Sequence, residues 1–160
     1  MAHRTIIAKQ IGDMAQIERV AAAALNPGHV LELTAANKLQ KHSSAGGNVV
    51  PLVVAIEDAL QGKEVSQAYA AADVVRGWVP RSGDEVVVVL KDGENIAIGD
   101  VVESAGTGEV QEHTPDADDS AGDVTTIYSN QILGTALEAL DLSDSSGADP
   151  SSRLLKILVA

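Results

Sequence analysis

The sequence predicts a mostly β protein, a small β-barrel or β-sandwich with an extended N-terminal arm and long acidic loops. Two observations lead to this fold class. Short runs rich in Val, Ile and Leu recur at intervals of roughly 8–12 residues, and Gly, Pro, Asp or Asn separates them. The 160-residue chain has no Phe and one Trp, so its core is expected to consist mainly of aliphatic side chains.

Residues 1–24 are interpreted as an N-terminal arm, and residues 25–160 as a β-rich domain. Two conformations remain open for the arm. Asp13 is a suitable N-cap for a helix over residues 14–25, an Asn-Pro-Gly turn would end that helix, and the alanines favour it. The isoleucines near the N-terminus and Val20 fit an extended segment equally well. Periodicity does not decide between them.

In the first half of the domain, strands are expected over residues 30–34, 49–56 and 73–79. Pro51 interrupts the second run, which indicates an edge strand or the start of a strand. Trp78 is expected to anchor the core, with an interface hot spot as the alternative. Tyr69 lies in an Ala-rich loop that its hydroxyl is expected to hold in place.

Residues 85–90 form the strongest predicted strand, because a continuous Val run indicates burial on both faces. The turn at Asp92-Gly93 predicts a hairpin to the next apolar run, residues 95–98. Further strands are expected at 101–103, 125–128, 132–140 and 154–159, with a helical turn as the alternative for 137–140. The acidic stretches 113–123 and 141–152 are expected to be loops.

The charge balance excludes several classes of partner. The chain has 23 acidic and 11 basic residues and a net charge of −12, which opposes binding to nucleic acid and to anionic membrane surfaces. The charge either maintains solubility or reflects adaptation to high salt, and the low Lys content favours salt adaptation. No run approaches the ~20 apolar residues of a membrane span, and no signal peptide is recognised, so a soluble protein made in the cytoplasm is expected.

No catalytic, cofactor-binding or metal-binding residue is predicted, and the chain is not expected to be an enzyme. The chain has no cysteine and no nucleophile-elbow or phosphate-loop motif, and Gly106-Thr107-Gly108 is expected to be a turn. The acidic residues 116–123 would suit a hard cation, but Ile127 breaks the EF-hand register, so a solvated loop is expected. The four histidines have no metal-ligand spacing and are expected on the surface or in loops: His3, His29, His42 and His113.

A series of short phrases, taken in order, resembles the head-decoration or capsid-cement proteins of tailed phages and of tailed viruses that infect haloarchaea. The phrases are LNPGHVLEL (25–33), AIED (55–58) with GK (62–63), YAAADVV (69–75), PRSGDEV (80–86), DGENIAIGD (92–100), GTALEA (134–139), and LSD (142–144) leading to RLLKI (153–157). The resemblance extends from residue 26 to the C-terminus, and the acidic composition matches the haloarchaeal branch.

The resemblance implies a structural virion protein that binds the outer surface of the capsid and stabilises the lattice of the major capsid protein. It implies an extended conformation for residues 17–25, and an arm, residues 1–24, that clasps the shell. A homo-oligomer is expected, a trimer at three-fold positions, located on the capsid exterior after assembly in the host cytoplasm. Pairing with a neighbour is expected at an exposed edge near Pro51 or through the arm. The alternative is a β-barrel binding module for a carbohydrate or a host surface ligand.

Overall fold

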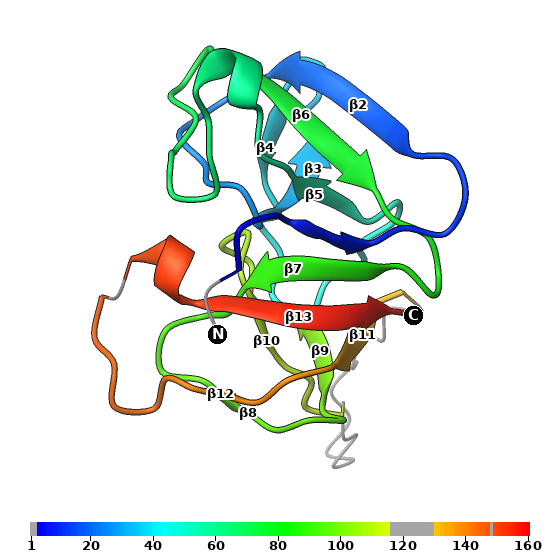
Figure 1. The fold of residues 1–160 in the computed structure, drawn as a ribbon, viewed down its shortest axis with the longest axis vertical. Coiled ribbons are helices and arrows are strands. Elements are labelled where there is room, and N and C mark those ends of the chain that lie inside the picture. The colour runs from blue at the N-terminus through cyan, green and yellow to red at the C-terminus, as the bar shows by residue number, and fades with distance from the viewer. Residues whose placement is uncertain (1–2, 116–129, 148) are drawn as a thin grey trace, which may run out of the picture.

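The computed structural model describes residues 3–115, 130–147 and 149–160, and these residues form a nearly all-β, sandwich-like fold of two stacked sheets (Figure 1). The upper sheet contains, in spatial order, β2 (Ala15–Val20), β6 (Val74–Val79), β5 (Val53–Ala55), β3 (Val30–Leu33) and β4 (Leu39–Lys41). The lower sheet contains β1 (Ile7–Lys9), β7 (Glu85–Val89), β13 (Leu154–Val159), β11 (Ile132–Ala136), β9 (Val101–Ser104) and β10 (Val110–Glu112).

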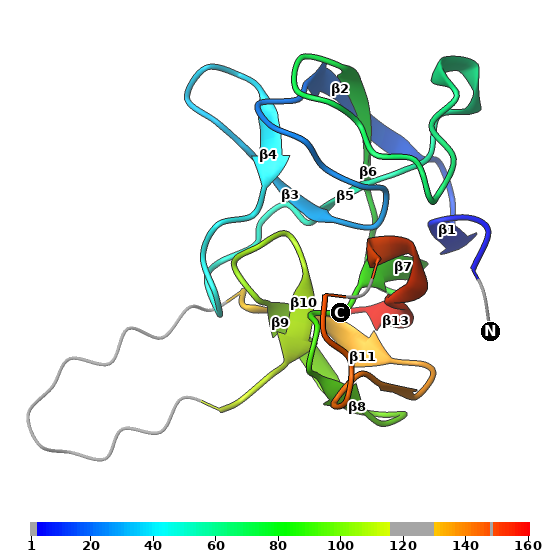
Figure 2. The ribbon, with the colours of Figure 1, turned by 90° about the vertical axis from the view of Figure 1, so that its left-hand side faces the viewer.

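Short elements complete the fold. A two-stranded sheet pairs β8 (Asn95–Ile96) with β12 (Leu140–Asp141), and two 3₁₀ turns, η1 (Ala59–Gln61) and η2 (Pro150–Ser152), lie in loops. Figure 2 shows the β3–β4 hairpin on the opposite side of the molecule from β1. The predicted strand 125–128 and the acidic residues 116–123 lie outside the described residues. No helix in the described ranges is long and apolar enough to cross a membrane.

The strand β7 lies inside the lower sheet and confirms the interpretation of the Val run. It pairs with β13 in register from Leu154 opposite Val89 to Leu158 opposite Glu85, and with β1 on its other side. Its four valines are fully buried, because side chains on both faces contact the core. A strand without a polar face is stable only between two apolar layers.

The two edge strands of the upper sheet, β2 and β4, approach each other at one end. A single parallel bridge links Ala21, just after β2, to Leu39 of β4, the strand at the opposite edge. No further pairing of these two edges is present in the described residues, so the predicted barrel is not closed and the sandwich alternative holds.

The beginning of the chain is extended, not helical. Residues of β2 pair with β6 from Ala15 opposite Val79 to Val20 opposite Val74. Ile17 packs against the upper cluster of buried side chains, and Ile6 is fully buried in the main core. Tertiary pairing therefore overrides the helical propensity of the alanines. The role of residues 1–24 as an arm remains a prediction.

The predicted hairpin at Asp92-Gly93 is wrong, although its turn is present. Gly93 has φ +88° and the Glu94 N–H donates to the Lys91 carbonyl at 3.3 Å. However, β8 pairs with β12 and not with β7. Both edges of β7 are already occupied by β1 and β13, so no position remains for β8.

Pro51 precedes a central strand. The peptide bond between Val50 and Pro51 is cis, and β5 begins two residues later, between β6 and β3. The prediction of a strand start is confirmed, while the edge alternative is wrong. The missing N–H of proline thus falls outside the ladder.

The aromatic side chains of β6 and of the loop before it are both buried, and for Trp78 this confirms the predicted core position. Trp78 lies in the main core. The hydroxyl of Tyr69 donates to the Ile56 carbonyl at 2.7 Å, which joins the Ala-rich loop to the end of β5. Burial, together with the nearby Asp58 carboxylate, raises the pKa of Tyr69 to about 12, so the hydroxyl remains a donor.

Replacing Tyr69 by Phe is expected to lower the free energy of unfolding by about 1–3 kcal/mol, because the buried Ile56 carbonyl would lose its donor. Urea denaturation monitored by circular dichroism measures this change. Ser143→Ala is the control: it removes an exposed hydroxyl that donates to Asp141, and about 0.5 kcal/mol or less is expected. Equal effects of the two substitutions would contradict the proposed tether.

Candidate interaction surface

A ridge formed by residues 49–52 separates two hollows of about 250 Å³ each. Val49 is buried and its N–H donates to the Asn130 carbonyl at 3.0 Å, whereas Val50 is 63% exposed. One hollow is bounded by residues of β3, β5 and the preceding loop: Leu31, Glu32, Leu33, His42, Asn48 and Val53. The other is bounded by Pro80, Ser82, Asn130, Ile132, Leu133, Val159 and Ala160.

Exposed apolar side chains continue the ridge on both sides. Leu33 is 51% exposed in the first hollow and Ile132 is 46% exposed in the second. Among the described residues that line the two hollows, Glu32 and His42 have ionisable side chains. On a chain with a net charge of −12, such an apolar region suits a protein contact better than a solvated surface.

His42 lies in the loop after β4, in agreement with the prediction of a surface or loop residue, but it is buried beside the ridge and not on the surface. It is buried; its Nδ1 lies 2.7 Å from the Ser104 hydroxyl, and its Nε2 lies 3.3 Å from the Asn48 carbonyl. These contacts join the lower sheet to the chain that leads into the ridge. A polar group buried with partners on both sides fixes a local structure.

A second polar cluster lies on the outer strands of the lower sheet. The buried carboxylate of Glu103 accepts from Gln111 Nε2 at 2.8 Å and lies 2.7 Å from His113 Nδ1. Gln131 Nε2 is 3.4 Å from the same histidine nitrogen. Both oxygens of the buried carboxylate thus have polar partners.

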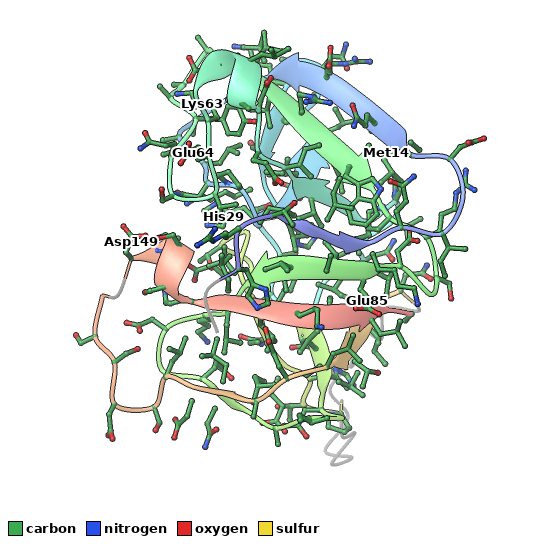
Figure 3. All side chains as sticks on the ribbon, in the orientation of Figure 1. Met14, His29, Lys63, Glu64, Glu85 and Asp149 are labelled. Carbon is green, nitrogen blue, oxygen red and sulfur yellow. The ribbon has the colours of Figure 1, made fainter. Side chains whose placement is uncertain are left out.

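His29 also lies in a loop, just before β3, as the prediction allowed, but it is buried between the two sheets and not on the surface (Figure 3). Its neighbouring turn joins the layers, because the Gly28 N–H donates to the Ala55 carbonyl and the Gly28 carbonyl accepts from the Val89 N–H. His29 Nδ1 accepts from the Asn26 N–H at 2.9 Å, while Nε2 is buried without a hydrogen-bond partner.

The pKa of His29 falls to about 3, chiefly because burial removes water and secondly because Lys41 and Arg153 are positively charged neighbours. The imidazole is therefore neutral at physiological pH. Arg153 is itself buried and donates to the Leu90 carbonyl at 3.0 Å and to Glu109 at 2.9 Å.

His3 is half-buried, and its Nε2 lies 2.5 Å from Glu138. Among the described residues, no group of three or more His, Asp or Glu side chains could hold a metal ion.

A third hollow has a volume of about 660 Å³ and does not resemble a carbohydrate site. Its walls are His3, Arg4, Glu57, Ala59, Lys63, Glu64, Val65, Ser66 and Ser151. Sugar-binding sites present aromatic faces, but Tyr69 and Trp78 are fully buried elsewhere. The described residues thus provide no aromatic surface that would support the alternative interpretation as a binding module.

Comparison with known proteins gives a likeness of fold. The chain matches the N base of the head fibre protein gp8.5 of bacteriophage phi29 with a TM-score of 0.52 and 11% sequence identity. The match covers 92% of this chain and 95% of the phage chain. No protein-family model and no curated protein sequence matches the chain. At this identity the comparison establishes a shared fold.

Proposed function

We propose that this protein is a structural component of a virus particle, without enzymatic activity, that binds the outer surface of a tailed-virus capsid and cements the major capsid protein lattice. The observation that carries the proposal is the likeness over nearly the whole of both chains to a base domain of a phage head fibre. The resemblance of the sequence phrases to decoration proteins supports the same role.

The ridge around Val50 is the proposed shell contact. It combines a protruding apolar side chain with two hollows that can accept side chains of the capsid protein. Many copies bound to one lattice act together. A modest affinity at each individual contact would therefore be sufficient to stabilise the shell. The expected location is the capsid exterior, and the expected partners are the major capsid protein and further copies of this chain.

Purified protein is expected to co-sediment with shells assembled from the major capsid protein of the same genome, at a saturating and fixed ratio. Val50→Asp should weaken this binding at least tenfold, because the carboxylate would lose its water at the contact. The matched control is Ile98→Asp, which changes an exposed isoleucine in the turn after β8, outside the ridge, and should bind as wild type.

Two outcomes have separate meanings. If the wild-type protein remains in the supernatant at every protein and salt concentration, the capsid-binding function is wrong. If wild type and Val50→Asp sediment equally, the capsid contact lies elsewhere and the ridge assignment is wrong.

A further inference from the structure

The strand β2 has an open edge. It is the first strand of the upper sheet and pairs with β6 on one side. The Ala21 N–H donates to the Asp73 carbonyl, just before the start of β6. In the same register, the other odd-numbered residues of β2 also direct their backbone N–H and C=O groups toward β6. The alternation of an antiparallel ladder then directs the backbone groups of Gln16, Glu18 and Val20 outward.

Among the described residues, the β3–β4 hairpin contacts this edge near its C-terminal end. The Ala22 N–H donates to the Leu39 carbonyl beyond Val20, and within β2 the Arg19 Nε donates to the side-chain oxygen of Asn37 at 3.0 Å. Within β2, the outward Glu18 carbonyl accepts from Arg19 Nη1 at 2.7 Å, an exposed contact between adjacent residues. An edge strand of six residues without proline is a template for another strand.

The side chains along this edge are arranged symmetrically about Ile17. Met14, seen at the side of the upper sheet in Figure 3, is 40% exposed, and Val20 is 36% exposed. Each lies three residues from Ile17, while the polar Gln16 and Glu18 flank it directly. A strand with such a pattern is complementary to an antiparallel copy of itself.

We propose that β2 pairs antiparallel with β2 of a second copy of this chain, around a two-fold axis at Ile17. In this register Met14 lies opposite Val20 of the second copy, Gln16 opposite Glu18, and Ile17 opposite its own equivalent. The two upper sheets become one continuous sheet across the axis. Met14, Ile17 and Val20 each meet an apolar partner, Glu18 meets the amide of Gln16, and Ala15 lies opposite Arg19.

The two registers whose axes lie next to Ile17 on the C-terminal side are unfavourable. An axis at Glu18 places two carboxylates directly opposite each other, and an axis at Arg19 does the same with two guanidinium groups. Like charges in directly opposed positions destabilise a pair of strands. Repulsion between like charges therefore disfavours the axes at Glu18 and Arg19, whereas the axis at Ile17 opposes no like charges.

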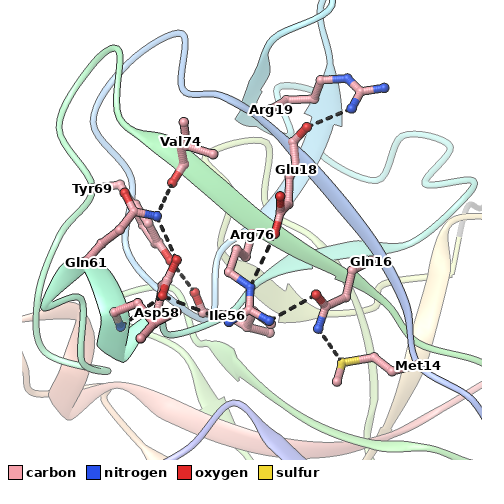
Figure 4. A network of polar contacts seen from close by, with 11 residues as sticks. Met14, Gln16, Glu18, Arg19, Ile56, Asp58, Gln61, Tyr69, Val74 and Arg76 are labelled. Carbon is pink, nitrogen blue, oxygen red and sulfur yellow. Dashed lines mark hydrogen bonds and ion pairs between the residues drawn. The ribbon is translucent and has the colours of Figure 1, made fainter.

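A polar network lies beside this edge (Figure 4). Arg76 of β6 donates from Nη2 to Gln16 Oε1 at 3.0 Å, and its Nε lies 3.7 Å from Glu18 Oε1. That Nε is buried and has no hydrogen-bond partner. Covering the edge with a second strand removes water from the Arg76–Glu18 pair and strengthens their attraction.

Single-cysteine variants test the register directly, because the natural chain has no cysteine. Under mild oxidation, Ile17→Cys is expected to give at least tenfold more disulfide-linked dimer than Ala15→Cys, the control. Ile17 would face its own equivalent at disulfide distance, whereas Ala15 would face Arg19. Equal cross-linking of the two variants would overturn the register.

Sedimentation equilibrium of the cysteine-free chain provides an independent readout. A dimer is expected, and it should become more stable as salt increases, because salt screens the repulsion between two chains of net charge −12. Met14→Asp should shift the equilibrium to monomer at least tenfold, while Leu60→Asp, at an almost fully exposed position on η1, should not. A monomer at every salt concentration, or a trimer, contradicts the two-fold contact. Either result leaves the capsid-binding function untouched.

Discussion

Lowering the pH from 6.5 to about 3 is expected to cost the folded protein about 5 kcal/mol of stability through His29 alone. The pKa of this side chain falls from 6.5 to about 3 on folding. Each pH unit between the two values corresponds to about 1.4 kcal/mol, which gives the expected total.

The sign follows from proton binding. Between pH 3 and pH 6.5 the unfolded chain binds a proton at His29, while the folded chain excludes it. The free energy of unfolding therefore rises with pH through this window. The stability that depends on neutral His29 is fully present above pH 6.5 and fully lost below pH 3. Protonation would place a third cation beside Lys41 and Arg153, at the turn that joins the two sheets.

Urea denaturation at pH values from 3.5 to 7.5 measures the dependence, and His29→Asn is the comparison. Asparagine can accept the Asn26 N–H in place of Nδ1, yet it does not titrate. Four aspartates also lose stabilisation in acid, because side-chain hydrogen bonds lower their pKa values: Asp73, Asp92, Asp141 and Asp149. They are present in both proteins, so the difference in slope isolates His29. Identical slopes for wild type and His29→Asn would show that the histidine contributes nothing.

Local features of the fold could be predicted from the sequence, and features set by distant pairing could not. The Val run of β7 and the burial of Trp78 follow from the hydrophobicity of their own segments. The partner of β8 depends on which strand edges remain open after β1 and β13 have paired with β7, and a good turn at Gly93 carries no such information. The choice between helix and strand for residues 14–25 was likewise settled by β6.

The candidate surface was only partly predictable. Pro51 indicated a special position, because proline cannot donate to a ladder. The exposure of Leu33 and Ile132 could not be predicted, since each lies at one end of a strand whose other apolar residues are buried. The buried histidines were missed for a related reason: His29 and His42 lie next to turns in the sequence, and the packing of one sheet on the other covers them.

The second large effect is expected at Gly134, where the strand β11 passes between β9 and β13. Gly134 lies opposite Val159 on one side and Val102 on the other, at an irregularity in the β9–β11 register. A Cβ atom at this position would lie 2.2 Å from the Leu158 carbonyl oxygen and 3.3 Å from the Val159 Cα. Since both neighbours are backbone atoms of a central strand, no side-chain rotation can relieve the collision.

Gly134→Ala is therefore expected to lower the free energy of unfolding by about 3 kcal/mol or more, because β11 must move away from β13. Gly93→Ala is the matched control: its Cβ meets no atom within 4 Å, and its φ of +88° alone should cost about 1 kcal/mol. Comparison of the two midpoints in urea separates collision from backbone strain. A Gly134→Ala midpoint equal to that of Gly93→Ala would mean that the lower sheet tolerates displacement of its central strands. The close approach of β11 to β13 would then have no part in holding that sheet together.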